Sequence, residues 1–519
     1  METIDESHDV NHNASENSSG NGAENALNKL KREEIVFVLQ TADAANAEYY
    51  LVYSLSERAP ANNDDGDSKP FTLSVLRVPK PQLPENLSEF LLDRGNLPVS
   101  SHLRPPREVH VVVSTGSGLR RAPEFYGSVL RPLLGALGLE ERGESHQDGN
   151  GNGPGYRLTV TKDSNTIRDF AGELGRDGTT TGERTIILLS GDGGVVDLLN
   201  GLDRADPPQS ATGSGPGSGS GSPTPPTIAL LPLGTGNALF HSLHKPLYNN
   251  KCTSPESDPA PSPLILGLRT LFQGTPAPLP TFRASFSPGA KLVSAPTEPE
   301  PDDPDSVEEE ATKVAVDHLV GAIVASYGFH ASLVWESDTP AYRVHGDKRF
   351  GMAAAELLKV SHAYDATVTV RRRGGGGEFI IMNLSDDNND NNRREGGGRL
   401  SYVLTTLVSN LERTFTISPA SRPLDGQLRL VHFGDVGGDR TMEIMMAAYR
   451  DGEHVGMDGV GYEEEVEEVM VAIAEEDPRW RKVCVDGSIV EVEKGGWMRV
   501  RREERERLRV LVDAAVITR

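Results

Sequence analysis

Two glycine-rich turns are the segments of this chain best suited to chemistry. The first, Ser190-Gly191-Asp192-Gly193-Gly194, follows the apolar run 185–189 and precedes a helical pattern over 195–202. The second, Gly234-Thr235-Gly236, follows the apolar run 228–233 and also precedes a helical pattern. Such turns let backbone N–H groups approach phosphate oxygens, and the dipole of the following helix favours negative charge. The pair predicts a phosphate site made by Gly191, Gly193, Gly194, Gly234, Thr235 and Gly236.

Asp192, among the glycines of the first turn, is the candidate general base. A carboxylate beside bound phosphate can accept the proton of an attacking hydroxyl while a phosphoryl group is transferred. A turn aspartate can also simply cap the helix that follows it. The second glycine turn favours the catalytic interpretation.

Both turns need buried strands ahead of them. Residues 107–246 alternate strand and helix patterns, with strands expected at 109–113, 156–160 and 185–189. This alternation predicts an α/β nucleotide-binding domain with a parallel sheet. Short strand candidates over 262–515 instead predict a C-terminal antiparallel β-sandwich domain, with a hairpin at 482–492 and a helix over 466–474. The predicted fold class is therefore α/β plus all-β.

The remaining segments are less regular. We expect a disordered tail at 1–30 and an N-terminal β unit at 31–106. Stretches rich in Pro, Gly, Ser, Asn or acidic residues predict flexible insertions at 206–227, 294–312 and 385–398.

Composition limits the binding partners and the cellular compartment that we expect for this protein. A net charge of −24 argues against nucleic acid and against broad adhesion to anionic membranes. Two cysteines give no disulfide framework, and no run reaches the roughly 18 apolar residues of a membrane span. We expect a cytoplasmic protein, and a homodimer stays open.

Segments 190–202 and 232–239 resemble the catalytic domain shared by diacylglycerol, ceramide and sphingosine kinases, whose fold is related to that of NAD kinase. Serine before Gly-Asp-Gly is most similar to sphingosine kinase. The segment 342–350 also matches its Tyr-Arg-x-x-Gly-x-x-Arg-Phe pattern. The resemblance covers roughly 107–245 and 320–495.

This resemblance implies an ATP-dependent kinase that uses Mg²⁺ and phosphorylates the primary hydroxyl of a sphingoid long-chain base. It implies a lipid substrate and peripheral contact with intracellular membranes. Diacylglycerol or ceramide is the alternative acceptor. A pseudokinase that binds nucleotide or lipid is a second alternative, since Ser114, Gly194 and Ser488 depart from the family pattern. NAD kinase shares the Gly-Asp-Gly turn but is disfavoured by segments 232–239 and 342–350.

The resemblance also assigns roles to single residues. Asp192 matches the family's base, and Asp486 matches an acidic position near nucleotide and metal. Asp197 stands where the family usually has a glutamate aimed at the nucleotide. Further nucleotide contacts are expected at Ser114, Thr115, Gly116, Thr161, Arg343, Arg349 and Gly487, and a substrate contact at Ser190.

The substrate assignment contains a conflict. Family enzymes place aspartates, one of which holds the sphingoid amine, where this chain has Ser332 and Val334. A buried ammonium without a carboxylate is costly. If a strand near Val334 slipped by two residues, Glu336 would face inward instead. We therefore keep Val334 and Glu336 as candidate substrate residues.

Overall fold

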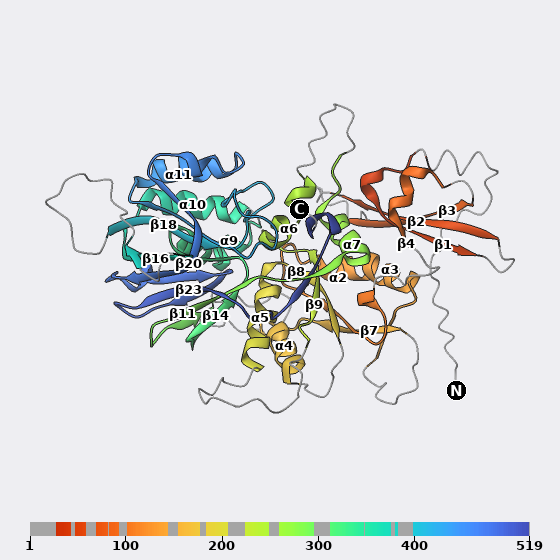
Figure 1. Cartoon of the computed structure of the whole chain (residues 1–519), viewed down its shortest axis with the longest axis horizontal. Coiled ribbons are helices and arrows are strands. Elements are labelled where there is room, and N and C mark those ends of the chain that lie inside the picture. The colour runs from red at the N-terminus through yellow and green to blue at the C-terminus, as the bar shows by residue number, and fades with distance from the viewer. Residues whose placement is uncertain are drawn as a thin grey trace.

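The computed structural model describes residues 27, 29–42, 47–58, 69–80, 83–92, 101–143, 154–176, 183–205, 224–248, 259–294, 312–346, 348–374, 379–381 and 398–517. Most of the predicted N-terminal tail and of the three predicted insertions lies outside these residues. Figure 1 shows a small sheet at one end of the molecule, an α/β unit in the middle and an antiparallel unit at the other end.

The segment expected to form an N-terminal β unit contains a small four-stranded sheet. Its strand order is β3-β2-β1-β4. One face packs on the α/β unit, where Phe37 meets Phe272 and Phe71 meets Phe125 edge to face. The strands are β1 (Ile35–Ala42), β2 (Glu48–Glu57), β3 (Phe71–Pro79) and β4 (Leu91–Leu92).

The middle unit is the predicted α/β domain. Its sheet has the order β10-β24-β9-β8-β5-β7-β6, and all neighbours pair in parallel except β10 with β24. The strands are β5 (Glu108–Val113), β6 (Glu140–Glu141), β7 (Gly155–Val160), β8 (Arg184–Ser190), β9 (Thr227–Pro232), β10 (Thr275–Pro278) and β24 (Arg509–Val512). The helices are α2 (Ala122–Phe125), α3 (Arg131–Ala136), α4 (Thr166–Arg176), α5 (Asp192–Ala205), α6 (Ala238–Tyr248), α7 (Pro263–Gln273) and α12 (Ala514–Ile517).

The expected boundary at residue 262 differs from the structure. Helix α7 packs on β9, while β10 and β24 extend the parallel sheet. These segments belong to the α/β unit because their apolar side chains join its core, among them Leu268, Phe272 and Leu511. The α/β unit is called the first unit below, and the antiparallel unit the second unit. The chain enters the second unit at about residue 281 and returns to the first unit with β24.

The second unit is antiparallel, as predicted, but its strands form one connected sheet. The order is β13-β12-β22-β21-β15-β18-β16-β20-β23-β11-β14, with β17 beside β16 and β19 bridging β18 and β20. The strands are β11 (Thr281–Phe286), β12 (Lys291–Val293), β13 (Lys313–Ala315), β14 (His318–Gly321), β15 (Val324–Gly328), β16 (Tyr364–Arg372), β17 (Phe379–Ile381), β18 (Gly398–Thr406), β19 (Leu428–Gly434), β20 (Val460–Ile473), β21 (Lys482–Val485), β22 (Ser488–Glu491) and β23 (Trp497–Glu503).

Helices cover part of this sheet. They are α8 (Phe329–Ser337), α9 (Pro340–Arg343), α10 (Lys348–Val360) and α11 (Gly437–Ala448). The helix expected over 466–474 is wrong, because these residues form the second half of β20. Within the described ranges, no helix combines the length and the apolarity needed to cross a bilayer.

Candidate functional site

The two glycine turns lie in direct contact. Strands β8 and β9 are parallel neighbours, with Ser190 opposite Pro232, so their turns leave the same edge of the sheet. A Cβ atom on Gly191 would lie 2.8 Å from the Cα of Gly234, and a Cβ on Gly234 would collide with the Cα of Gly191. Glycine is needed at both positions because one backbone passes directly against the other.

A cluster of hydroxyl groups lines the same edge of the sheet. Ser190 Oγ lies 3.0 Å from Ser117 Oγ, which donates to Ser114 Oγ at 2.7 Å. At the end of β7, Thr161 Oγ1 accepts the N–H of Thr115 at 2.9 Å. Ligands of open α/β sheets bind outside the carboxyl ends of the strands, where all these groups lie. The structure therefore brings Ser114, Thr115, Thr161 and Ser190 together with the glycine turns.

Asp192 is the first residue of α5, yet its carboxylate caps α6. Its Oδ2 accepts the N–H of Ala238 at 2.7 Å and its Oδ1 accepts the N–H of Leu239 at 3.1 Å. These are the first two residues of α6, so Asp192 joins the two turns. Burial raises the pKa of Asp192 to about 6, and the two N–H donors oppose that rise. A carboxyl group with such a pKa is ionised at neutral pH and a stronger base than an ordinary aspartate.

Asp486 is the second carboxyl group of the site. It lies in the predicted hairpin turn between β21 and β22, which the structure confirms, with a positive φ of 48°. Its oxygens accept the N–H groups of Ala322, Ile323 and Val324 at 2.6 to 3.3 Å. Burial raises the pKa of Asp486 to about 7, and the charge of Asp192 adds to the rise. The two carboxyl groups, one from each unit, are therefore near enough for their charges to interact.

A magnesium ion is compatible with these donors. Mg²⁺ in phosphoryl-transfer sites usually takes one or two carboxylates and completes its shell with phosphates and water. Asp192, in the first glycine turn, and Asp486, whose charge interacts with that of Asp192, supply two carboxylates. The described residues contain no group of three or more acidic, His or Cys side chains that would hold a metal without such help.

Asp197 lies away from the turns. Its Oδ1 accepts a hydrogen bond from Arg168 Nη2 at 2.8 Å, and both side chains are largely buried. This ion pair ties α5 to α4 along their packed faces. The structure thus gives Asp197 a partner within the protein, and its expected contact with the nucleotide stays a prediction.

Arg343 and Arg349 converge on one carboxylate. Arg343 Nη2 and Arg349 Nη1 contact the two oxygens of Asp338 at 2.7 and 2.9 Å. Between them, Gly346 approaches Leu119, which belongs to the loop after β5: a Cβ on Gly346 would lie 3.9 Å from Leu119 Cδ2. The arginine segment therefore borders the loop that carries Ser114, Thr115 and Gly116. The partner role of Asp338 was not anticipated from the sequence.

The expected strand near Val334 is wrong, because residues 329–337 form helix α8. A shift of two residues on a helix turns a side chain by about 200°, so Val334 and Glu336 point in different directions. Val334 packs beside Ala331, Cys484 and Ile489. Glu336 pairs with Arg479 at 3.3 Å. The slip that would bring Glu336 inward is therefore not available.

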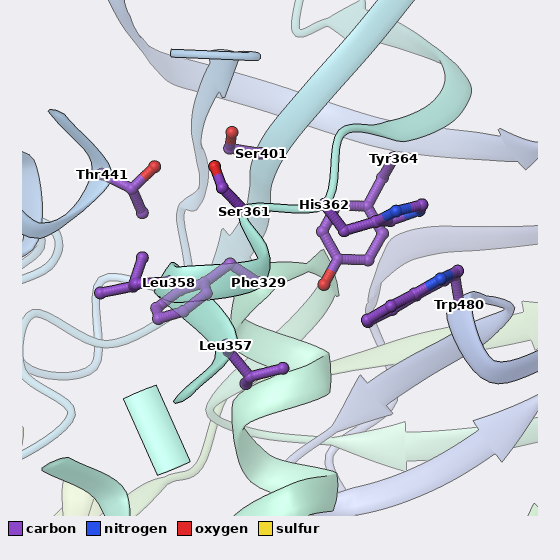
Figure 2. Close-up of a pocket in the computed structure, with 9 residues that line it drawn as sticks. All are labelled: Phe329, Leu357, Leu358, Ser361, His362, Tyr364, Ser401, Thr441 and Trp480. Carbon is purple, nitrogen blue, oxygen red and sulfur yellow. The ribbon is translucent and has the colours of Figure 1, made fainter. Parts of the chain in front are cut away.

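An apolar pocket in the second unit was missed from the sequence. Figure 2 shows Phe329, Leu357, Leu358, Tyr364 and Trp480 around it, with Ser361, His362, Ser401 and Thr441 supplying polar atoms. The rings of His362 and Trp480 stack 4.2 Å apart. No local motif could have identified this pocket, since its walls come from α8, α10, α11, β16 and β18.

A second pocket lies between the two units, beside the carboxyl pair. Its walls include Leu239, whose N–H binds Asp192, and Ala322, whose N–H binds Asp486. The other side chains are mostly apolar, with Leu243, Leu279 and Leu424 among them. The pocket thus shares Leu239 and Ala322 with the hydrogen bonds that hold the two carboxylates, although neither carboxylate lines it.

A comparison with known protein families finds a match within the α/β unit. Residues 141–256 match the family model of the diacylglycerol kinase catalytic domain. This match spans both glycine turns and Asp192, whereas Arg343 and Asp486 lie beyond it. No curated protein matches the chain. Residues 141–256 are therefore similar to a diacylglycerol kinase catalytic domain.

Three solved structures are similar over most of their length. Two, each described as a "putative diacylglycerol kinase" of Bacillus anthracis str. Sterne, cover 79% of this chain. The first is 13% identical with a TM-score of 0.47 and 96% of its chain covered. The second is 12% identical with a TM-score of 0.46 and 98% covered. Yeast NADH kinase complexed with NADH is 10% identical, with a TM-score of 0.32, and the match covers 79% of this chain and 85% of that one.

Proposed function

We propose that this chain is an ATP-dependent lipid kinase that phosphorylates a primary hydroxyl group. The observation that carries the proposal is the position of Asp192, a carboxylate with a raised pKa at the contact between two glycine turns. Phosphoryl transfer needs such a base to accept the hydroxyl proton, together with groups that hold the phosphates. The match of residues 141–256 to the diacylglycerol kinase catalytic domain supports the same reaction.

Each part of the site has a role in this proposal. Backbone N–H groups of the turns at Gly191 and Gly234 bind the ATP phosphates, and Ser190 orients the acceptor hydroxyl. Asp192 takes the proton from that hydroxyl onto a carboxylate oxygen. Bound Mg²⁺ supplies positive charge that neutralises the phosphates, and Asp192 and Asp486 are the residues that would hold it. Arg343 and Arg349, oriented by Asp338, add charge-assisted hydrogen bonds to phosphate.

The acceptor proposed from the sequence is a sphingoid base, but one observation favours a neutral lipid such as diacylglycerol or ceramide. Three carboxylates on or beside the elements that line the apolar pocket of Figure 2 already have a cationic or N–H partner. Glu336 binds Arg479, Asp338 binds two arginines, and Glu475 accepts hydrogen bonds from His362 and from the N–H of Asp365. Ser332 is bonded to Tyr364. A buried ammonium would need to displace one of these partners.

A lipid acceptor also requires contact with a membrane surface, which we propose for the outer side of α11. Met442 and Met446 lie one turn apart on this helix and are exposed. Thr441, which precedes Met442, lines the apolar pocket. The exposed methionines therefore lie close to this apolar pocket.

The direct test is a phosphorylation assay with radiolabelled ATP and a lipid panel in mixed micelles. The full chain is incubated with sphingosine, ceramide and diacylglycerol in turn, with Asp192→Asn as the control. Label transfer that needs Asp192 supports the proposal, and the preferred lipid decides between the two acceptor classes. If nucleotide binds but no lipid becomes labelled, the chain is a pseudokinase and the proposal is wrong.

A further inference from the structure

A buried side-chain amide of helix α5 pairs with the backbone of the second unit. Asn200 is buried, and its Oδ1 accepts the N–H of Val320 at 3.0 Å. Its Nδ2 donates to the carbonyl of Val320 at 3.0 Å and to the carbonyl of Val196 at 2.8 Å. The amide thus pairs with both backbone groups of one residue of β14, as a neighbouring strand would. This pairing fixes the position of β14 along α5.

The segment that follows Val320 holds Asp486. The next three residues after Gly321 donate the N–H groups that bind the Asp486 carboxylate. Gly321 itself has no room for a side chain, since a Cβ would lie 2.9 Å from Asp486 Oδ2 and would collide with the ring of Phe282. The position of the Asp486 carboxylate therefore depends directly on the backbone of 320–324.

The same helix begins with Asp192. Asn200 follows Asp192 by eight residues, which is about 12 Å along a rigid helix. The first residue of α5 is thus the candidate base, and Asn200, in the second half of the same helix, pairs with the segment that orients the second carboxyl group. We propose that Asn200 is a positioning residue, which sets the placement of Asp486 relative to Asp192 by pairing with Val320. This inference rests on the proposed kinase function.

Residue Asn200 acts through backbone groups and touches neither substrate in this proposal. Its loss should therefore lower turnover more than nucleotide affinity, because Asn200 bonds Val320 and neither the glycine turns nor the two arginines. Misplacement of a catalytic group by about 1 Å can cost on the order of 100-fold in rate. A residue that merely supported the fold would change stability without this division between kcat and KM.

The test compares three variants of the full chain. Asn200→Ala removes the amide, and Gly321→Ala forces a Cβ against Asp486 while leaving Asn200 in place. His318→Gln is the matched control, because His318 binds Asp203 of α5 at the other end of β14, at 2.6 Å. Each variant is measured for kcat and for the KM of ATP on the preferred lipid. Hydrogen exchange of the amides of 322–324 is followed separately, without nucleotide.

For Asn200→Ala we expect kcat to fall by about 10- to 100-fold and the KM of ATP to stay within about threefold. Exchange at 322–324 should become faster. Gly321→Ala should show the same loss of kcat, whereas His318→Gln should keep wild-type kcat and wild-type exchange at these amides.

Two results would overturn the inference: a folded Asn200→Ala with kcat within about twofold of wild type, or unchanged exchange at 322–324. If the wild-type chain labels no lipid, the proposed function fails by itself. The exchange measurement then still decides whether Asn200 holds the segment that binds Asp486. If Asn200→Ala does not fold, Asn200→Asp, which keeps an acceptor for the N–H of Val320 but loses the donor to its carbonyl, supplies the same comparison.

Discussion

At the scale of single residues, Asp192 combines two tasks that the sequence presents as alternatives. It caps a helix, but that helix is α6, which begins 46 positions later in the chain. The same two hydrogen bonds hold the carboxylate at the contact of the glycine turns. Capping and catalysis are therefore compatible, because each carboxylate oxygen accepts one N–H and keeps a lone pair for a proton.

Replacing Asp192 with Asn should abolish phosphoryl transfer and spare nucleotide binding. The loss of a general base lowers the rate by about 10²- to 10⁴-fold. The amide can accept only one of the N–H groups of Ala238 and Leu239, so the free energy of unfolding should fall by about 1 kcal/mol. Turnover, ATP affinity and the melting temperature check these expectations. Near-normal turnover in Asp192→Asn would refute the assignment of the base.

The pH dependence of turnover follows from the same residue. Because burial raises the pKa of Asp192 to about 6, the base is protonated and inactive below that pH. We expect kcat to rise with pH through about 6, together with a second step near 7 if Asp486 must also ionise. The two groups interact, so the steps belong to the pair. If kcat instead rises at the ordinary pKa of an aspartate and stays flat at higher pH, through 6 and 7, the raised pKa is contradicted.

Ionisation of Asp192 has opposite effects on stability and on activity. The protonated form favours the folded state, whereas the ionised form is the active base. The folded state holds the Asp192 proton more tightly than the unfolded chain does. This contribution to the free energy of unfolding is complete below the ordinary aspartate pKa and is lost as the pH rises through about 6. The site becomes active over the range in which Asp192 ceases to favour the folded state.

At the scale of elements, the patterns that predicted structure correctly are local ones. A β-branched run followed by Gly-Asp-Gly predicts β8 and α5, and Asp486-Gly487 between apolar alternations predicts the hairpin of β21 and β22. Helix α8 was missed, because its apolar residues surround the helix and show no one-sided period. The second half of β20 was read as a helix, although Val469, Val471 and Ile473 alternate into the core.

Only the part of the site that belongs to the α/β unit could be predicted from the sequence. The glycine turns and the hydroxyl groups follow consecutive strands of one sheet, so topology brings them together. Other contacts could not be predicted. The hydrogen bonds of Asp192, Asn200 and Asp486 join segments that are distant in the chain. The ion pairs of Asp338 depend on a local fold of α8 and α9 that no sequence pattern indicated. Such contacts depend on how the two units pack, which the spacing of residues in the sequence does not encode.

The arginine segment gives a prediction at the level of α9 and α10. Both arginines bind Asp338, but Arg349 has 19% of its side chain exposed and Arg343 has 44%. A less exposed guanidinium loses less of its interaction energy to water. Arg349→Met should therefore raise the KM of ATP by about tenfold or more, and Arg343→Met by less. Titration of ATP at saturating lipid measures this difference, and an effect on the KM of the lipid alone would contradict the phosphate role.

Asp338→Asn provides the control for this pair. It keeps the size of the side chain but removes the charge that orients both arginines. We expect a rise in the KM of ATP smaller than that of Arg349→Met, since the guanidinium groups remain. Should Asp338→Asn leave the KM of ATP unchanged, the ion pairs do not orient the arginines for phosphate.

At the scale of the whole molecule, the charge distribution bears on how a strongly acidic protein meets a lipid surface. The net charge of −24 disfavours attraction to anionic membranes. Around α11, the nearby cations are paired with close carboxylates: Arg440 with Glu443, Arg450 with Glu453, and Lys359 of α10 with Glu356. Segment 435–453 carries five acidic residues and two arginines, so the surface around the exposed methionines suits zwitterionic rather than anionic lipid. Figure 1 places α11 at the outer edge of the second unit, next to α10.

We therefore expect Met442→Glu and Met446→Glu to weaken binding to phosphatidylcholine vesicles and to slow phosphorylation of lipid held in them. Their side chains are 39% and 49% exposed, and a glutamate there would have to enter the headgroup region. Val75→Glu is the matched control, because Val75 is 52% exposed on β3 at the opposite end of the molecule. With a short-chain acceptor dispersed in water, all three variants should keep wild-type turnover, since none touches the carboxyl pair or the glycine turns. Equal vesicle binding by wild type and both methionine variants would exclude α11 as the contact surface, while the short-chain assay would still report on the kinase reaction itself.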